Sequence, residues 1–285
     1  MAHLVHHRRR LSAHPTGRIA ADSRINGLAV LGGLLVFWWL ASTWVAQTSD
    51  RADVLLPSPL DVVRSIRGLA VFAEPGAELT YGNAARVIVE HTAASGMRLL
   101  AGLVLGAAAG VGAGLALGWS RHLRALVEGP LLAIRVIPLL ALLPLFLAWY
   151  GGREAGNVTF IAFAVFAMLF VSTLEAVRNV DPVVQDYART LGASPLRVYR
   201  TVVVPAIIPE LTAGVRVVLG VAWAILLAAE FLASQDGIGH ILILAQQYSY
   251  TDRMILIVLL IMVYTYVLDR VFAALSGRLT RWTPR

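Results

Sequence analysis

The chain has 285 residues, of which 58% are hydrophobic and only 14% are charged, and its mean hydropathy is +0.72. It contains neither cysteine nor lysine, which excludes a disulfide framework, a cysteine metal site and a Walker A phosphate loop, whose lysine is indispensable. The net charge of +7 rests on arginines that mostly lie between long apolar runs, so the positive-inside rule of membrane proteins explains it better than nucleic-acid binding does.

Six apolar runs are long enough to cross a bilayer, whose core of about 30 Å needs roughly 20 helical residues. The first run is too long for the apolar region of a signal peptide and has no small-residue cleavage site after it, so we expect an uncleaved span. The sequence therefore predicts an all-α polytopic membrane protein with six transmembrane helices. The runs cover residues 27–46, 95–119, 130–150, 157–176, 212–233 and 254–275.

The arginines orient these spans. With both termini in the cytoplasm, fourteen arginines lie on the inside and six on the outside, and four of the six belong to one longer outer segment, where the bias is weaker. Pro57 and Pro59 in that outer segment precede apolar residues at helical spacing, which predicts a short interfacial helix. The expected organisation is a cytoplasmic tail 1–26, a first span 27–46, an extracytoplasmic segment 47–94, a core domain of five helices 95–276 and a cytoplasmic tail 277–285.

Two runs carry unusual residues. The second has a glycine at every fourth position, which lets another backbone approach one helix face. This face packs within one subunit or forms a subunit interface or moving surface, and the pattern leaves both possibilities open. The third contains Pro130, Pro138 and Pro144, which predicts an irregular helix that lines a cavity, although kinked structural helices are also common. The helix-packing glycines are Gly102, Gly106, Gly110, Gly114 and Gly118.

A polar stretch, DYARTLGASPLRVYRTVVVP, lies in the loop 178–211 between the fourth and fifth runs. Asp181-Pro182 and Ser194-Pro195 are helix starts, Gly192 fits a left-handed helix end, and Pro205 marks the end of the second helix. The first helix places Val184, Tyr187, Ala188 and Leu191 on one face. Such a structured helix pair is a docking surface for a partner or a pair of helices lying on lipid headgroups.

The same stretch resembles the EAA loop of ABC-transporter permeases, in which E-A-A is followed after three residues by G and after nine more by I-x-L-P. Here Asp186-Tyr187-Ala188 replaces E-A-A, Gly192 follows at the right distance, and Val202-x-Val204-Pro205 replaces I-x-L-P. The resemblance runs from about Leu55 to Trp282 and narrows to permeases of the aliphatic sulfonate, nitrate and taurine importers. Its other landmarks are LPSP at 56–59, ARTLGAS at 188–194, AAE at 228–230, Gly-Ile-Gly at 237–239 and Thr251-Asp252.

The resemblance implies a permease with the type I ABC importer fold in the bacterial cytoplasmic (inner) membrane. It implies a non-catalytic chain without metal or cofactor, paired with a second and identical permease subunit, two cytoplasmic ATPases that hold ATP and Mg, and an extracytoplasmic solute-binding protein. The solute would be a small anion such as a sulfonate, taurine or nitrate. The ATPase-coupling residues would be Asp186, Tyr187, Ala188, Arg189, Leu191, Gly192, Pro195 and Pro205.

Charged residues inside spans are costly and are therefore candidates for function. Arg135 is the natural counter-charge for an anion, and Glu230 and Pro138 are further candidates for the translocation pathway. Alternatively, Arg135 reaches the cytoplasmic surface, and Glu230 pairs with an arginine for structure alone. The alternative function is a secondary transporter or channel driven by an ion gradient through Glu230 and Arg135. An intramembrane enzyme has no support, because HExxH and GxSxG motifs are absent.

Overall fold

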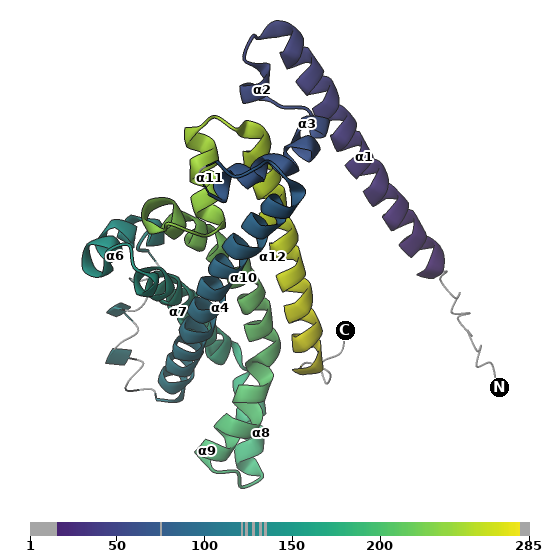
Figure 1. The fold of residues 1–285 in the computed structure, drawn as a ribbon. Coiled ribbons are helices and arrows are strands. Elements are labelled where there is room, and N and C mark those ends of the chain that lie inside the picture. Colours follow the sequence, from purple (N-terminus) through teal and green to yellow (C-terminus); the bar gives the residue numbers. More distant parts are fainter. Residues whose placement is uncertain are drawn as a thin grey trace, which may run out of the picture. The chain divides into compact units, whose positions relative to one another are not determined.

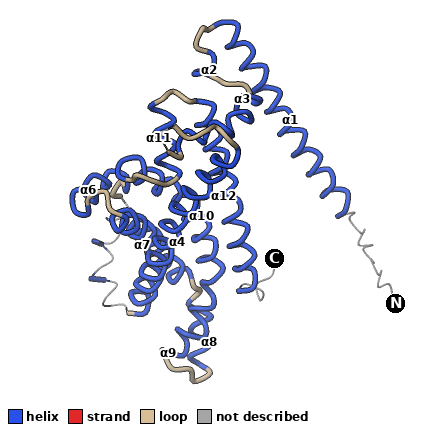
Figure 2. Tube along the Cα trace, viewed as in Figure 1, coloured by secondary structure: helices blue, strands red, loops and turns tan. Residues whose placement is uncertain are grey.

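The computed structural model describes residues 16–74, 76–120, 122, 125, 126, 129, 130, 133 and 136–279, and the regular elements within this part are helices (Figures 1 and 2). The expected all-α fold of a polytopic membrane protein is confirmed. Five helices of the described part are long and apolar enough to cross a membrane. They are α1 (Thr16–Thr48), α4 (Tyr81–Trp119), α7 (Glu154–Asn179), α10 (Val204–Ala233) and α12 (Thr251–Leu279).

The chain divides into two compact units, which meet at Asp61 and Val62. The first unit contains α1 and the short α2 (Ala52–Leu55). Its span is apolar all round, and within this unit large side chains such as Leu28 and Phe37 are uncovered, as expected of a membrane-spanning helix. The indole nitrogen of Trp38 donates a hydrogen bond to the carbonyl of Pro57 (3.1 Å) and so fastens the returning chain to α1.

The second unit is built on the close packing of α4 against α7. A Cβ on Gly106 would lie 2.4 Å from the carbonyl oxygen of Ala162, and one on Gly110 would lie 2.8 Å from that of Phe166. All five glycines of the stripe are buried and face α7, so the two backbones approach each other along the second half of α4. The core continues from this pair to α10 and α12. Its fully buried side chains include Phe160, Phe170, Leu226 and Ile257.

The residues expected to form an interfacial helix are helical, and some of their side chains are buried in the second unit. They form α3 (Pro59–Arg64) and the 3₁₀ helix η1 (Ser65–Phe72). Leu69 and Ala70 are fully buried in the core of the second unit. Part of the apolar surface of this segment is therefore covered by helices of the second unit, whereas Leu60 and Val63 are 54% and 61% exposed.

The third apolar run is irregular, as its prolines predicted. Pro138 is extended (ψ 103°), and the chain then forms a 3₁₀ turn, η2 (Leu139–Leu142), followed by α6 (Leu143–Tyr150). Pro144 lies in the first turn of α6, where its missing N–H costs no hydrogen bond. Together Leu139–Tyr150 form a shorter apolar helix. Arg135 and most of residues 121–135 lie outside the described residues.

Two features of the helices differ from the expected runs. α4 begins at Tyr81, far before residue 95, because Thr80 caps it by accepting a hydrogen bond from the backbone N–H of Asn83 (3.2 Å). A further helix, α11 (Ile238–Gln247), follows α10. Hydropathy marks the apolar middle of a helix but not its polar ends, and α11 is too short to register as a span.

Candidate functional site

The polar loop folds as a helix pair whose ends are fixed by local hydrogen bonds. α8 (Pro182–Thr190) begins where the Asp181 carboxylate accepts a hydrogen bond from the backbone N–H of Val183 (2.8 Å). It ends in a Schellman motif, in which the N–H of Gly192 donates to Arg189 (2.9 Å) and that of Ala193 donates to Ala188 (3.2 Å). Gly192 has the expected left-handed conformation (φ 82°), which makes the turn sharp and well defined.

The second helix of the pair continues into a long helix. α9 (Pro195–Val198), capped by the Ser194 hydroxyl, passes through a π-helical turn, η3 (Tyr199–Val203), directly into α10. The prediction that Pro205 ends this helix is wrong. Pro205 lies in the first turn of α10, and the wider hydrogen-bond spacing of the preceding π turn accommodates its missing N–H.

One side of α8 carries an exposed apolar surface. Its large apolar side chains are 51–72% exposed. α8 is too short to span a membrane, so this exposure is not that of a transmembrane helix. Beside them, Asp186 and Arg189 form an exposed ion pair (2.9 Å). We define the α8 face as Val183, Val184, Tyr187 and Leu191. A large exposed apolar patch flanked by charges is typical of a protein interaction site.

The helix pair is anchored to the bundle at its base. The Tyr199 hydroxyl donates a hydrogen bond to the carbonyl of Leu115 (2.6 Å), and its ring meets Trp119 edge-on with 5.1 Å between the centroids. Val203 and Ile207 are buried in a small cluster with α7 side chains. α8 and α9 are therefore connected to α10 through η3 and to the end of α4 through Tyr199.

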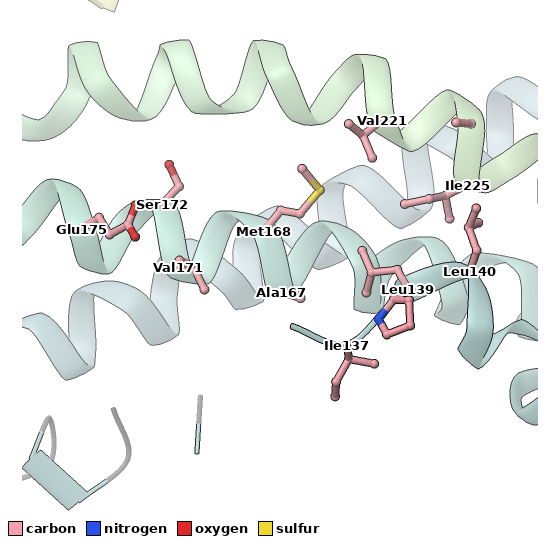
Figure 3. A pocket seen from close by; sticks show the side chains of 12 residues that line it. Ile137, Leu139, Leu140, Ala167, Met168, Val171, Ser172, Glu175, Val221 and Ile225 are labelled. Atoms are coloured by element: carbon pink, nitrogen blue, oxygen red, sulfur yellow. The ribbon is translucent and has the colours of Figure 1, made fainter. Parts of the chain in front are cut away.

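A cavity of about 590 Å³ lies between the segment at Pro138, α7 and α10. Its walls are mostly apolar, with Met168 and Ile225 among them, and Figure 3 shows Ser172 and Glu175 towards one end. The structure thus places Pro138 at a cavity, as an irregular helix segment would allow. Arg135, the other pathway candidate from this region, lies outside the described residues.

Glu230 does not line this cavity, because its side chain is fully buried at a second place. The Nη1 atom of Arg98 donates a hydrogen bond to Glu230 (2.8 Å) and to the carbonyl of Asp236 (3.0 Å). Its Nε donates to Glu154 (2.7 Å), and its Nη2 contacts the carboxylates of Glu154 and Asp236. The Arg98 side chain is 3% exposed and that of Glu230 is 0% exposed. We call Arg98, Glu154, Glu230 and Asp236 the Arg98 cluster.

Glu230 also holds the start of α11. Its carboxylate accepts hydrogen bonds from the N–H of Gly239 (2.8 Å) and from the Ser95 hydroxyl (2.8 Å), which in turn accepts one from the N–H of Ile238 (2.7 Å). A Cβ on Gly237 (φ 105°) would lie 2.4 Å from this carboxylate. The motifs AAE (228–230) and Gly-Ile-Gly (237–239) therefore contact each other, through the carboxylate of Glu230 and the backbone of the two glycines.

Sequence reasoning missed most of the Arg98 cluster. An arginine within an apolar run is a usable signal, but its partners Glu154 and Asp236 stand in polar segments and have no such mark. Arg216, a second arginine in a span, pairs with Asp269 through two hydrogen bonds of 2.7 Å. Arg98 and Arg216 are thus neutralised by carboxylates, whereas the guanidinium of Arg270, in the run 254–275, lies 5.7 Å from the centre of the Tyr266 ring.

Comparisons with known proteins agree with this architecture. A family model described as "Binding-protein-dependent transport system inner membrane component" matches residues 102–281. A probable ABC transporter permease protein of Brucella abortus is 33% identical over 264 residues, which cover 93% of this chain and 99% of the relative. The taurine transport system permease protein TauC of Escherichia coli is 32% identical over 90% of this chain and 88% of its own. The putative aliphatic sulfonates transport permease protein SsuC of Bacillus subtilis is 28% identical, with coverages of 90% and 87%.

Proposed function

Because this chain belongs to the family of binding-protein-dependent transport system inner membrane components, we propose that it forms the translocation pathway of an ATP-driven importer and is driven through α8. It is a multi-pass ABC-transporter permease, as the family and the relatives show. The observation that carries the proposal is the exposed α8 face on a rigid, well-capped helix.

The partner at α8 is a cytoplasmic ATPase. An amphipathic helix that exposes four large apolar side chains fits an apolar groove, and the Asp186–Arg189 pair adds polar contacts at the rim. ATP and Mg are held on that partner, since a chain without lysine cannot build a Walker A loop. Closure of two ATPases pushes the helix pair, and the continuous backbone of α9, η3 and α10 carries the push into the membrane.

The arrangement around the chain follows from the arginine distribution. Both termini and the α8 loop lie in the cytoplasm, and a solute-binding protein approaches the opposite side. Two copies of the permease, each with one ATPase, enclose the pathway. Hydrolysis occurs on the ATPase, and this chain catalyses no reaction itself.

The solute is a small organic sulfonate, such as an alkanesulfonate anion or zwitterionic taurine, whose sulfonate group carries the negative charge. Two relatives are named for taurine and for aliphatic sulfonates. The cavity bounded by Pro138, α7 and α10 has apolar walls, which favour a solute with a carbon stem over a bare anion such as nitrate. Arg135 supplies the counter-charge in this proposal, and Glu230 serves the Arg98 cluster instead of the pathway.

The test is uptake by proteoliposomes that contain the permease with its ATPase, in the presence of the binding protein. We expect uptake of labelled taurine or an alkanesulfonate only when ATP is supplied on the ATPase side. Uptake that continues without the ATPase and collapses with an imposed ion gradient would instead establish the secondary transporter. Arg135→Ala should weaken uptake of the anion, with Arg153→Ala, another arginine of the neighbouring segment, as the control.

A further inference from the structure

α10 connects the α8–α9 helix pair with the Arg98 cluster. Figure 1 shows α8 and α9 at one end of α10 and α11 towards the other. The helix has 30 residues and so extends about 45 Å at 1.5 Å per residue. Glu230 lies in its last turn, and its first residue, Val204, is joined through η3 to α9 and α8. A push on α8 therefore arrives at Glu230.

In the Arg98 cluster, one guanidinium contacts three carboxylates, and the four residues come from four separate segments of the chain. Arg98 comes from α4, Glu154 from the start of α7, Glu230 from the end of α10, and Asp236 from the turn before α11. Glu154 and Asp236 are 65% and 56% exposed, so water can solvate their charges. Glu230 is fully buried, and Arg98 is the cation that balances it. The planar fork of arginine, unlike an ammonium group, reaches carboxylates in several directions at once.

The second half of the linkage joins Glu230 to α11. Its carboxylate occupies the space beside Gly237 and Gly239, where a Cβ would lie 2.4 Å and 2.7 Å from Glu230 atoms. The N–H groups of Ile238 and Gly239 donate to Ser95 and Glu230, so the first turn of α11 is capped by residues of α4 and α10. The charge on Glu230 is also favourable at this end of the helix dipole.

We propose that Arg98 and Glu230 are positioning residues that fix α11 to the far end of α10, so that movement of α8 and α9 is transmitted to α11. α11 then moves together with α10, and the cluster is part of the transmission between the ATPase side and the opposite side. This inference rests on the proposed function, because it requires a push at α8. The proposed function specifies neither the residues that transmit the movement beyond α10 nor the helix that moves. The inference assigns these roles to Arg98 with Glu230 and to α11.

A purely stabilising cluster is the competing explanation, and paired replacement separates the two. Breaking a buried ion pair on one side leaves an uncompensated charge, whereas replacing both partners by neutral groups of similar shape is often neutral for stability. Arg98→Met with Glu230→Gln removes both charges, and the glutamine oxygen can still accept from Gly239. Glu154 and Asp236 lose a partner but remain solvated.

The first experiment compares stability with transport in this double variant. We expect a Tm within a few degrees of that of the unmodified permease, continued ATP hydrolysis, and uptake that is lower by about tenfold or more, within the usual range of coupling free energies. Arg86→Ala with Glu90→Ala, which removes an exposed ion pair from the same helix, is the control and should leave uptake unchanged. Normal uptake by the double variant would overturn the proposal.

The second experiment follows α11 directly and decides the matter if the double variant is unstable. The chain has no natural cysteine, so spin labels can be placed at Leu232→Cys and Tyr248→Cys, which are 62% and 64% exposed at the ends of α10 and α11. We expect the distance between these labels to stay constant when ATP binds. In a Glu230→Gln background, which keeps the hydrogen-bond acceptor, the distance should shift or broaden on ATP binding. A distance that behaves identically in both backgrounds would refute the linkage.

The experiments distinguish failure of the importer proposal from failure of the proposed role of the Arg98 cluster. An unmodified permease without ATP-dependent uptake would remove the importer proposal itself. An ATP-dependent permease with normal uptake after Arg98→Met and Glu230→Gln would remove only the role of the cluster.

Discussion

Tyr187 lies at the centre of the α8 face, at the position of the first alanine in the E-A-A motif. Its ring is 67% exposed, and Leu191 one turn later is 72% exposed. Aromatic and aliphatic side chains that protrude in this way are typical anchors of an interface, because filling a partner pocket removes their apolar surface from water. At the scale of single residues, the proposed docking of an ATPase would therefore depend on a few protruding side chains more than on the exposed ion pair beside them.

Leu191→Asp should remove this recognition without unfolding the permease. The carboxylate is harmless on an exposed position but would be desolvated in an apolar groove, so we expect the affinity for the ATPase to fall at least about tenfold. Co-purification of the two proteins from detergent measures the effect. Thr201→Asp, which adds the same charge at an exposed position outside the α8 face, is the control. Equal ATPase recovery with both variants would contradict docking through this face.

At the scale of elements, the close pairing of α4 with α7 forms the centre of the second unit, and α10 packs against it. Lipid tails are as apolar as the side chains, so close packing of backbones contributes more to this pairing than the hydrophobic effect does. The glycine stripe makes such an approach possible within one subunit. Of the two roles that the sequence left open for the stripe, the described structure shows the packing role.

Gly106→Ala should destabilise the pairing of α4 with α7. The added methyl group would lie 2.4 Å from the carbonyl oxygen of Ala162, and a backbone atom cannot move aside as the end of a side chain can. We expect a loss of about 1–3 kcal/mol, seen as a lower Tm in detergent. Gly112→Ala on the same helix meets no atom within 4 Å and should leave the Tm unchanged or slightly raised. Equal melting of the two variants would show that the helices tolerate separation at Gly106.

At the scale of the whole molecule, orientation in the membrane decides which partner reaches which site. The arginine bias predicts that the α8 loop lies inside and that the segment before α4 lies outside. This orientation determines whether an ATPase or a binding protein can contact α8, and it is independent of how the helices pack.

Single cysteines in the cysteine-free chain test the orientation. Thr190→Cys, in the α8 loop, should react with a membrane-impermeant maleimide only after the cells are permeabilised. Glu78→Cys, exposed before α4, should react in intact spheroplasts. The opposite labelling pattern would invert the topology and remove ATPase docking at α8.

The sequence predicted the elements whose signals are local. Asp181-Pro182, Gly192 and Ser194-Pro195 form caps through residues a few positions away, and the structure has each of these hydrogen bonds. The prediction that Pro205 ends a helix is wrong because the preceding π turn accommodates the proline, and no local sequence pattern indicates such a turn. The extent of α4 was underestimated because its first turns are polar.

By itself, the sequence determined that this is an arginine-rich, all-helical membrane protein with a structured loop between two spans, because length, hydropathy and capping are properties of neighbouring residues. Only the tertiary structure decided what Arg98 and Glu230 do. They are 132 positions apart, and their other partners, Glu154 and Asp236, come from two further segments. Burial of a charge forces it to find an opposite charge in space, and which residues supply it depends on how the helices pack.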